Sequence, residues 1–283
     1  MTPRADMRAT LLVSALLVGL ATAAGAGDAP RRIASLNLCA DQLLLALADP
    51  DRIAALGPLS RDRAYSRLAE RAEAFPRIRG AEDLLMRDVD LVLIGPHDDR
   101  YTRSVLAERG IRTEIVPPWT SIDRGRAEIR RVAALLGRPE RGEALVAEID
   151  AALARLPRVR PGTTALALER RGWAPGAATL VHDVLRRMGF SEPVGGSGQA
   201  GGGFVPMERL VLAAPDMVVL DRAPPEAEDQ GTAWLLHPAM LAALPPERRL
   251  VADARLTICG GPSTPELIDA LGEQVRRSGL ALP

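Results

Sequence analysis

Two stretches of this chain alternate short apolar strand patterns with helix patterns, and this alternation limits the possible fold more than any other feature. The strands are predicted at 32–36, 53–56, 90–94, 113–116, 164–168, 217–220 and 249–251. Helices are predicted between and after them at 40–48, 82–86, 101–109, 179–188 and 265–277. Strands that alternate with helices predict parallel sheets with both faces covered, so the expected class is α/β.

Two longer amphipathic helices separate these stretches. The first is predicted at 121–136, with Ser121 as its N-cap and Gly137 just after its end. The second is predicted at 139–156 and has Pro139 at its first position. The predicted organisation is an N-terminal lobe at 27–118, a helical segment at 119–160 and a C-terminal lobe at 161–283.

The two lobes share a short pattern. Glu82-Asp83-Leu84 is followed eight residues later by Asp90-Leu91-Val92, and Glu208-Arg209-Leu210 is followed at the same interval by Asp216-Met217-Val218. Each predicts a helical turn, a short connection and a buried strand. The shared interval fits a pseudo-duplicated pair of α/β lobes.

The first 26 residues are typical of an export signal. Arg4 and Arg8 precede a short apolar run at 11–21, and Ala24-Gly25-Ala26 fits a signal peptidase site. A transmembrane anchor is the alternative, but the run is shorter than the roughly 20 residues that a membrane span needs. Residues 1–26 are therefore predicted to be a cleaved signal peptide, which places the mature chain in an oxidising compartment.

Composition excludes several classes of protein. The 36 basic residues are all Arg and balance 36 acidic residues, so no bulk charge favours nucleic acid. The absence of Lys excludes Schiff-base and P-loop chemistry. Two Cys and three His argue against zinc fingers and iron–sulfur clusters, and His97, His182 and His237 form no metal-ligand pattern. No metal site and no cofactor are predicted.

In open α/β sheets, ligands bind beyond the carboxyl ends of the strands. The loops that follow predicted strands, with the loop before the last helix and nearby aromatic residues, supply the candidate ligand-binding residues. These are Asn37, Leu38, Cys39, Tyr65, His97, Trp119, Arg170, Arg171, Trp173 and Cys259. Their types predict a polar, Arg-rich cleft with flat apolar walls.

Three phrases carry a family resemblance. They are "RRIASLNLCADQLLLALADPDRIAALG", "RIRGAEDLLMRDVDLVLIG" and "FVPMERLVLAAPDMVVLD". In this order and spacing they resemble the periplasmic substrate-binding proteins of iron-complex and cobalamin ABC transporters, over about residues 31–280. The resemblance implies a class III binding protein: two Rossmann-like lobes joined by a single long α-helix, here 139–156, with the ligand cleft between the lobes.

The resemblance also implies a function. A monomeric periplasmic receptor would capture a metal chelate (a ferric siderophore, haem or a cobalamin-like compound) and deliver it to the permease of an ABC importer. In such proteins one Glu on each lobe docks onto the permease, and those positions match Glu82 and Glu208. The alternative function is an exported α/β enzyme, such as a hydrolase or chelatase, although no G-x-S-x-G or H-E-x-x-H motif occurs.

Several of these residues also have a purely structural explanation. Glu82 and Glu208 suit the first turn of any helix, and Arg170 and Arg171 suit any exposed surface. Export makes a disulfide between Cys39 and Cys259 conceivable, but a bond across the cleft would lock the lobes together. Two separate thiols are therefore the favoured expectation. The glycine-rich segment 195–203 lacks a following Lys and is expected to be a flexible connection at the cleft rim.

Overall fold

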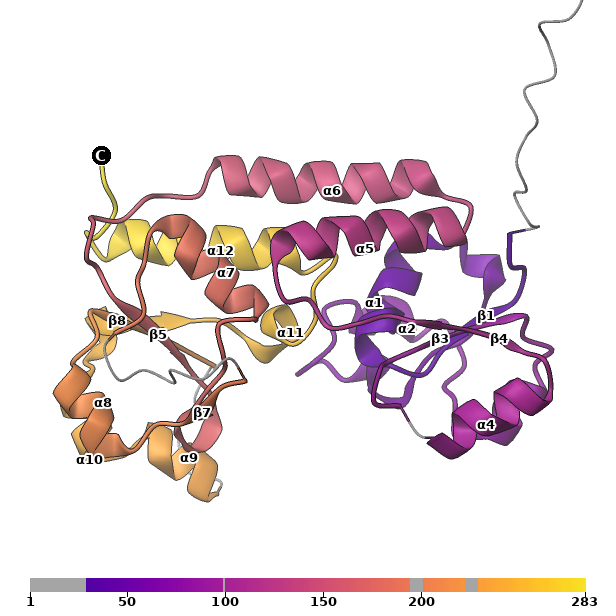
Figure 1. Ribbon diagram of the computed structural model, residues 1–283, viewed down its shortest axis with the longest axis horizontal. Helices are drawn as coiled ribbons and strands as arrows, with labels where there is room; N and C mark the ends of the chain where they lie inside the picture. Colours follow the sequence, from indigo (N-terminus) through magenta and orange to yellow (C-terminus); the bar gives the residue numbers. More distant parts are fainter. Residues whose placement is uncertain (1–28, 99, 194–200, 222–228) are drawn as a thin grey trace, which may run out of the picture.

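The computed structural model describes residues 29–98, 100–193, 201–221 and 229–283. The predicted signal peptide at 1–26 lies outside the described residues, as does most of the glycine-rich segment 195–203. Two α/β lobes lie next to each other, beneath a layer of long helices that runs along one side of the molecule (Figure 1). The predicted α/β class is confirmed.

The N-terminal lobe is built on a parallel sheet in the order β2-β1-β3-β4. Its strands are β1 (Ile33–Ser35), β2 (Ile53–Ala55), β3 (Leu91–Ile94) and β4 (Arg112–Ile115). Its helices are α1 (Leu38–Leu47), α2 (Ala69–Ala72), α3 (Ala81–Leu85) and α4 (Arg100–Glu108). Every residue of β3 is apolar and buried, as a central parallel strand requires. The strand order changes direction between β1 and β3, where an open sheet offers a ligand site.

The C-terminal lobe has a smaller parallel sheet in the order β5-β8-β9, and a two-stranded antiparallel pair formed by β6 and β7. Its strands are β5 (Ala165–Leu168), β6 (Trp173–Ala174), β7 (Gly203–Phe204), β8 (Met217–Leu220) and β9 (Arg249–Val251). Its helices are α7 (Leu180–Met188), α8 (Met207–Ala213), α9 (Gln230–Leu235), α10 (Pro238–Ala243), α11 (Ala254–Thr257) and α12 (Thr264–Arg277). α7 ends at Gly189, which adopts the left-handed conformation that favours glycine at this position.

Three helices form the layer above the lobes: α5 (Ile122–Leu135), α6 (Pro139–Ala154) and α12. The Ser121 hydroxyl accepts a hydrogen bond from the Arg124 backbone N–H at 3.3 Å, which caps α5 as predicted. α6 packs against both α5 and α12 and extends over both lobes (Figure 1). α6, the long helix expected to join the lobes, is thus packed within a group of three helices, and its role as the single connection between the lobes stays a prediction.

Local sequence patterns located the main elements within two residues of their ends. The patterns missed six short elements: α2, α9, α10, α11, β6 and β7. The four missed helices have only one or two turns and the two missed strands only two residues each, so no clear apolar period marks them and packing against neighbours decides their conformation.

The seam between the lobes is closed by a disulfide bond and a buried ring. Cys39, in α1, is bonded to Cys259, in the loop before α12, with their Cα atoms 5.0 Å apart. The expectation of two separate thiols was wrong, because the fold brings these two loops within disulfide reach. Beside the bond, the Trp119 ring lies so close to Gly125 and Gly260 that a Cβ on either glycine would approach it to 2.1 and 2.0 Å.

Candidate functional site

Two adjoining cavities lie at the carboxyl ends of the C-terminal sheet, where that lobe faces the N-terminal lobe. Their volumes are about 350 and 300 Å³. The side chains common to both are Glu169, Pro175, Val181, Thr257 and Ile258. From the N-terminal side, the segment 118–120 lines the first cavity and Tyr65 lines the second. We call this pair of cavities the interlobe site.

Tyr65 reaches the interlobe site from a loop that α1 holds in place. The turn at Asp62 begins the loop, because the Asp62 carbonyl oxygen accepts hydrogen bonds from the backbone N–H groups of Tyr65 at 3.1 Å and Ser66 at 2.7 Å. The buried Gln42 side chain of α1 donates to the Ser66 hydroxyl at 2.8 Å and accepts from the Leu68 N–H at 3.2 Å. The Tyr65 side chain stays 40% exposed, so its phenol is available to a ligand.

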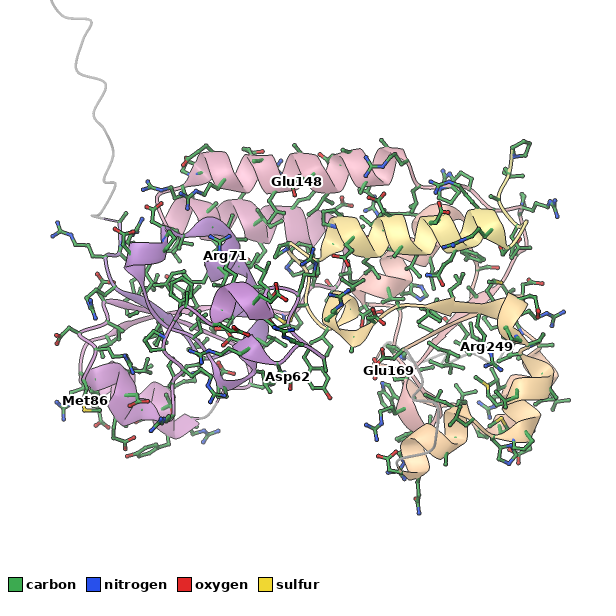
Figure 2. All side chains as sticks on the ribbon, turned by 180° about the vertical axis from the view of Figure 1, so that it is seen from behind. Asp62, Arg71, Met86, Glu148, Glu169 and Arg249 are labelled. Atoms are coloured by element: carbon green, nitrogen blue, oxygen red, sulfur yellow. A yellow bond between two sulfur atoms is a disulfide. The ribbon has the colours of Figure 1, made fainter. Side chains whose placement is uncertain are left out.

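Two carboxylates stand at the strand ends on the opposite wall. Glu169 directly follows β5, and Asp221 directly follows β8. Burial raises the pKa of the Glu169 carboxyl, and the nearby charge of Asp221 raises it further. Asp221 accepts a hydrogen bond from the Ala254 backbone N–H at 3.0 Å. Figure 2 shows Glu169 and Asp62 on the margins of the two lobes that face each other.

This wall differs from the Arg-rich cleft that the sequence predicted. Arg170 lines the site, but its guanidinium forms an ion pair with Asp229. Arg171 is exposed, adopts a left-handed conformation with φ of 60°, and lines neither cavity. Glu169 and Asp221 were not among the predicted ligand residues, although each is the first residue after a buried strand. That position was the signal that could have found them.

The equivalent edge of the N-terminal sheet is occupied by its own polar groups. The Asn37 side chain caps α1 by accepting from the Cys39 backbone N–H at 2.9 Å. Asp98 accepts from the Gly95 N–H at 2.6 Å. Asp41 is fully buried and accepts from the Gly57 N–H at 2.9 Å, while its second carboxylate oxygen has no hydrogen-bond partner within the described residues.

The buried Asp41 carboxyl has an unusual pKa. The pKa is raised from 3.8 to about 7, chiefly by burial and slightly by the charge of Asp98, while the Gly57 backbone N–H and the nearby Ser35 hydroxyl lower it in part. A carboxyl this deep serves the packing of α1 against the loop after β2, and it is not accessible to a ligand.

The other predicted ligand residues are divided by the structure. Trp119 lines the interlobe site, and Cys259 lies between two of its lining residues but is itself buried in the disulfide. Leu38 opens α1, and His97 is exposed after β3. Trp173 packs edge-to-face on Phe204, with ring centroids 5.0 Å apart. None of these last three residues lines the two cavities, and their roles in binding stay predictions.

A larger hollow lies elsewhere, on the N-terminal lobe alone. It measures about 780 Å³ and is lined by Arg61, Arg77, Arg79 and Arg87 together with Asp83. It is open and polar, and no residue of the other lobe borders it. The interlobe site is therefore the better candidate for a ligand, because residues from both lobes line it and its walls are mostly apolar.

Within the part of the chain that the structure describes, no group of three or more His, Cys, Asp or Glu side chains is placed to hold a metal ion. Over the same residues, no helix combines the length and apolar character that a membrane span requires.

Comparison with known proteins identifies the family. Residues 33–233 match the model of the family described as "Periplasmic binding protein". The chain belongs to the periplasmic binding protein family. No curated protein sequence matches it significantly. Membership of a family of binding proteins supports the receptor over the exported enzyme.

Solved structures of this periplasmic binding protein fold align along most of the chain. The periplasmic heme-binding protein RhuT from Roseiflexus sp. RS-1 has a TM-score of 0.67 and 22% identity over 88% of this chain and 98% of that chain. A periplasmic heme-binding protein from Pseudomonas aeruginosa has a TM-score of 0.65 and 21% identity, with coverages of 90% and 95%. A protein of an Fe3+-hydroxamate transport system from Saccharomonospora viridis has a TM-score of 0.63 and 23% identity, with coverages of 89% and 94%.

Proposed function

We propose that this protein is a periplasmic receptor that captures an iron chelate, either haem or a ferric siderophore, and delivers it to the permease of an ABC importer. The observation that carries the proposal is the position of Tyr65: a half-exposed phenol at a mostly apolar cavity enclosed by both lobes. The heme-binding and Fe3+-hydroxamate proteins that share this fold support the choice of iron chelates. The proposal includes export by the signal peptide at 1–26 and a monomeric receptor.

The chemistry of the interlobe site suits such a cargo. A tyrosine phenolate is a hard oxygen donor and a known axial ligand of ferric haem. Pro175, Val181 and Ile258 offer apolar walls to a flat macrocycle. Because its pKa is raised, Glu169 takes up a proton more readily and can then donate a hydrogen bond to an anionic group of the chelate.

Two tyrosines make the cargo proposal testable. Tyr65 and Tyr101 are the only tyrosines in the chain, and Tyr101 is an exposed residue of α4 outside the interlobe site. Tyr65→Phe should weaken haem binding at least about tenfold and shift the haem absorption bands, because the ligand oxygen is lost. Tyr101→Phe should bind haem as the parent protein does.

Titration with a ferric hydroxamate separates the two cargoes, because its iron is already fully coordinated by the siderophore. If this compound is the cargo, it should bind tightly to both the parent and the Tyr65→Phe variant, while haem binds weakly to both. Failure of the purified protein to bind either compound, or recovery of a chemically altered compound, would contradict the receptor proposal.

Glu82 and Glu208 are proposed to dock onto the permease. Both are exposed, and neither carboxylate has an ion-pair partner within the described residues. Glu82→Arg combined with Glu208→Arg should abolish uptake and leave chelate affinity unchanged, since neither residue lines the interlobe site. Uptake by whole cells and chelate titration of the purified variant measure the two effects. Normal uptake by the double variant would overturn the docking proposal.

A further inference from the structure

The two lobes repeat one helix–strand unit in the same register. α3 leads to β3 in the first lobe, and α8 leads to β8 in the second. Three residues before each strand, a non-glycine residue adopts the left-handed conformation: Asp88, with φ of 50°, and Ala214, with φ of 40°. Few non-glycine residues adopt this conformation. Its recurrence at the same position shows that the two units are equivalent in structure as well as in sequence.

Hydrogen bonds confirm this register. Asp90 directly precedes β3 and accepts from the backbone N–H of Arg32, the residue before β1, at 3.1 Å. Asp216 directly precedes β8 and accepts from the backbone N–H of Thr164, the residue before β5, at 2.8 Å. In both lobes the same carboxylate therefore ties the central strand to its neighbour, and equivalent residues can be compared one by one.

The comparison reveals a pair of exposed apolar residues. Glu82 and Glu208 occupy equivalent positions, and four residues later stand Met86 and Leu212. Met86 is 75% exposed and Leu212 is 85% exposed, the highest values among the large apolar side chains that the structure describes. Residues four apart in a helical turn lie on the same face, so each lobe presents a carboxylate next to an apolar side chain.

In each helix, the leucine that lies between the Glu and the exposed apolar residue is buried. Leu84 and Leu210 are fully buried and hold their helices against the sheets. Each unit thus has a well-packed inner face, and the exposure of Met86 and Leu212 does not come from a loose helix. A Met in one lobe and a Leu in the other leave the same apolar character at the same place, with nothing in the described chain to cover it.

Both pairs lie at the end of the molecule away from the helix layer. Met86 is at the far end of the N-terminal lobe from α6 (Figure 2), and α8 is at the corresponding end of the C-terminal lobe (Figure 1). A partner that touches this end meets the same arrangement twice, once on each lobe. Two equivalent contact points fit a partner that itself offers two equivalent sockets.

We propose that Met86 and Leu212 are the apolar anchors of a two-point docking surface for the permease. Each enters an apolar depression of the membrane protein next to a cation that faces Glu82 or Glu208. The inference rests on the proposed function for the identity of the partner and adds the residues that supply most of the binding energy. Buried apolar anchors at the centre of a contact set affinity, whereas exposed charges set approach and register.

The test measures binding of the chelate-loaded receptor to its cognate permease reconstituted in lipid nanodiscs. Met86→Ser combined with Leu212→Ser should weaken this binding about tenfold or more, to a similar degree at low and high salt. Glu82→Gln combined with Glu208→Gln should weaken it mainly at low salt, because salt screens exposed charges. Chelate affinity should stay at the parent value in both.

Leu282→Ser is the matched control. Leu282 is 44% exposed, but it lies near the C-terminus, on the side of the helix layer. The Leu282→Ser variant should bind the permease as the parent does.

Unchanged permease binding by the Met86 and Leu212 double variant overturns the anchor proposal, even where the Gln variants confirm docking. Parent-like binding by the Gln pair at low salt, together with normal uptake by the Arg variants, overturns docking itself. Loss of a self-association of the receptor, with permease binding intact, assigns the anchors to a second copy of this chain and also overturns the proposal.

Discussion

The two lobes share an architecture but use the carboxyl ends of their strands differently. In the N-terminal lobe, Asn37, Asp41 and Asp98 turn inward and bond to their own backbone. In the C-terminal lobe, Glu169 and Asp221 border cavities that a ligand can enter. The first edge, which we call the closed edge, borders only a smaller hollow of about 200 Å³ at Asp98, whereas the second, the open edge, borders the two cavities of the interlobe site.

This difference shows that a repeated fold can be alike in one part and unlike in another. The helix–strand units that contain α3 and α8 have the same register, down to a left-handed residue in each. The strand-end edges differ in the polar groups that they carry and in how these groups are bonded. The disulfide and Trp119 join the unlike edges and hold them facing each other.

Removal of the disulfide, which joins the two strand-end edges, should have the largest effect on the free energy of unfolding. Cys39→Ser combined with Cys259→Ser should lower the free energy of unfolding by about 4 kcal/mol, because the bond closes a loop of 220 residues and restricts the unfolded chain. Denaturant unfolding measures the change. Reduction of the parent protein should lower the free energy of unfolding by the same amount, and reduction of the double variant should have no further effect. A loss below about 1 kcal/mol would show that the helix layer alone holds the edges together.

An effect of similar size should come from the buried Asp41 at the closed edge. The pKa of Asp41 in the fold is about 7, above the value of 3.8 for an ordinary Asp. Between these values the folded state holds a proton that the unfolded state releases, so the contribution of Asp41 to stability is full below about pH 4 and is lost as the pH rises to about 7. The fall attributable to Asp41 should be a few kcal/mol, at about 1.4 kcal/mol per pKa unit.

Asp41→Asn should remove this fall, because an amide cannot ionise. The difference in unfolding free energy between the variant and the parent should therefore grow in favour of the variant from pH 4 to pH 8. Asp51→Asn, at an exposed carboxylate of the same lobe, is the control and should leave the pH profile of stability as it is. An equal pH profile for Asp41→Asn and the parent would contradict a neutral, buried carboxyl at the closed edge.

The smallest effect on stability should come from adding a methyl group at Gly260, next to Trp119 in the seam between the lobes. Gly260→Ala would place a Cβ within 2.0 Å of the Trp119 ring, so the ring must move and the protein should lose about 1–3 kcal/mol of stability. Gly201→Ala meets no atom within 4 Å and should change stability much less. Near-ultraviolet circular dichroism reports whether the tryptophan environment changes. An unchanged spectrum and unchanged stability for Gly260→Ala would show that Trp119 does not depend on this contact.

The sequence was a good guide to the candidate site only in part. Tyr65, Trp119 and Arg170 were predicted and do line the interlobe site. Arg170 and Arg171 are neighbours in sequence, yet only Arg170 lines the site, and Arg171 has a left-handed backbone. Asn37, also predicted for the ligand, caps its own helix with its side-chain oxygen, and its role in binding stays a prediction. Which predicted residues line one cavity depends on how segments far apart in the chain pack together.

By itself, the sequence determined the alternating strands and helices, the two lobes and the repeated unit. These depend on apolar periods and on caps such as Ser121, which act within a few residues. Only the tertiary structure decided that Cys39 meets Cys259 across 220 residues, and that Glu169 and Asp221 line the open edge together with a single Arg, Arg170. Both outcomes depend on how two lobes pack together, and no local pattern records the distance between loops on different sheets.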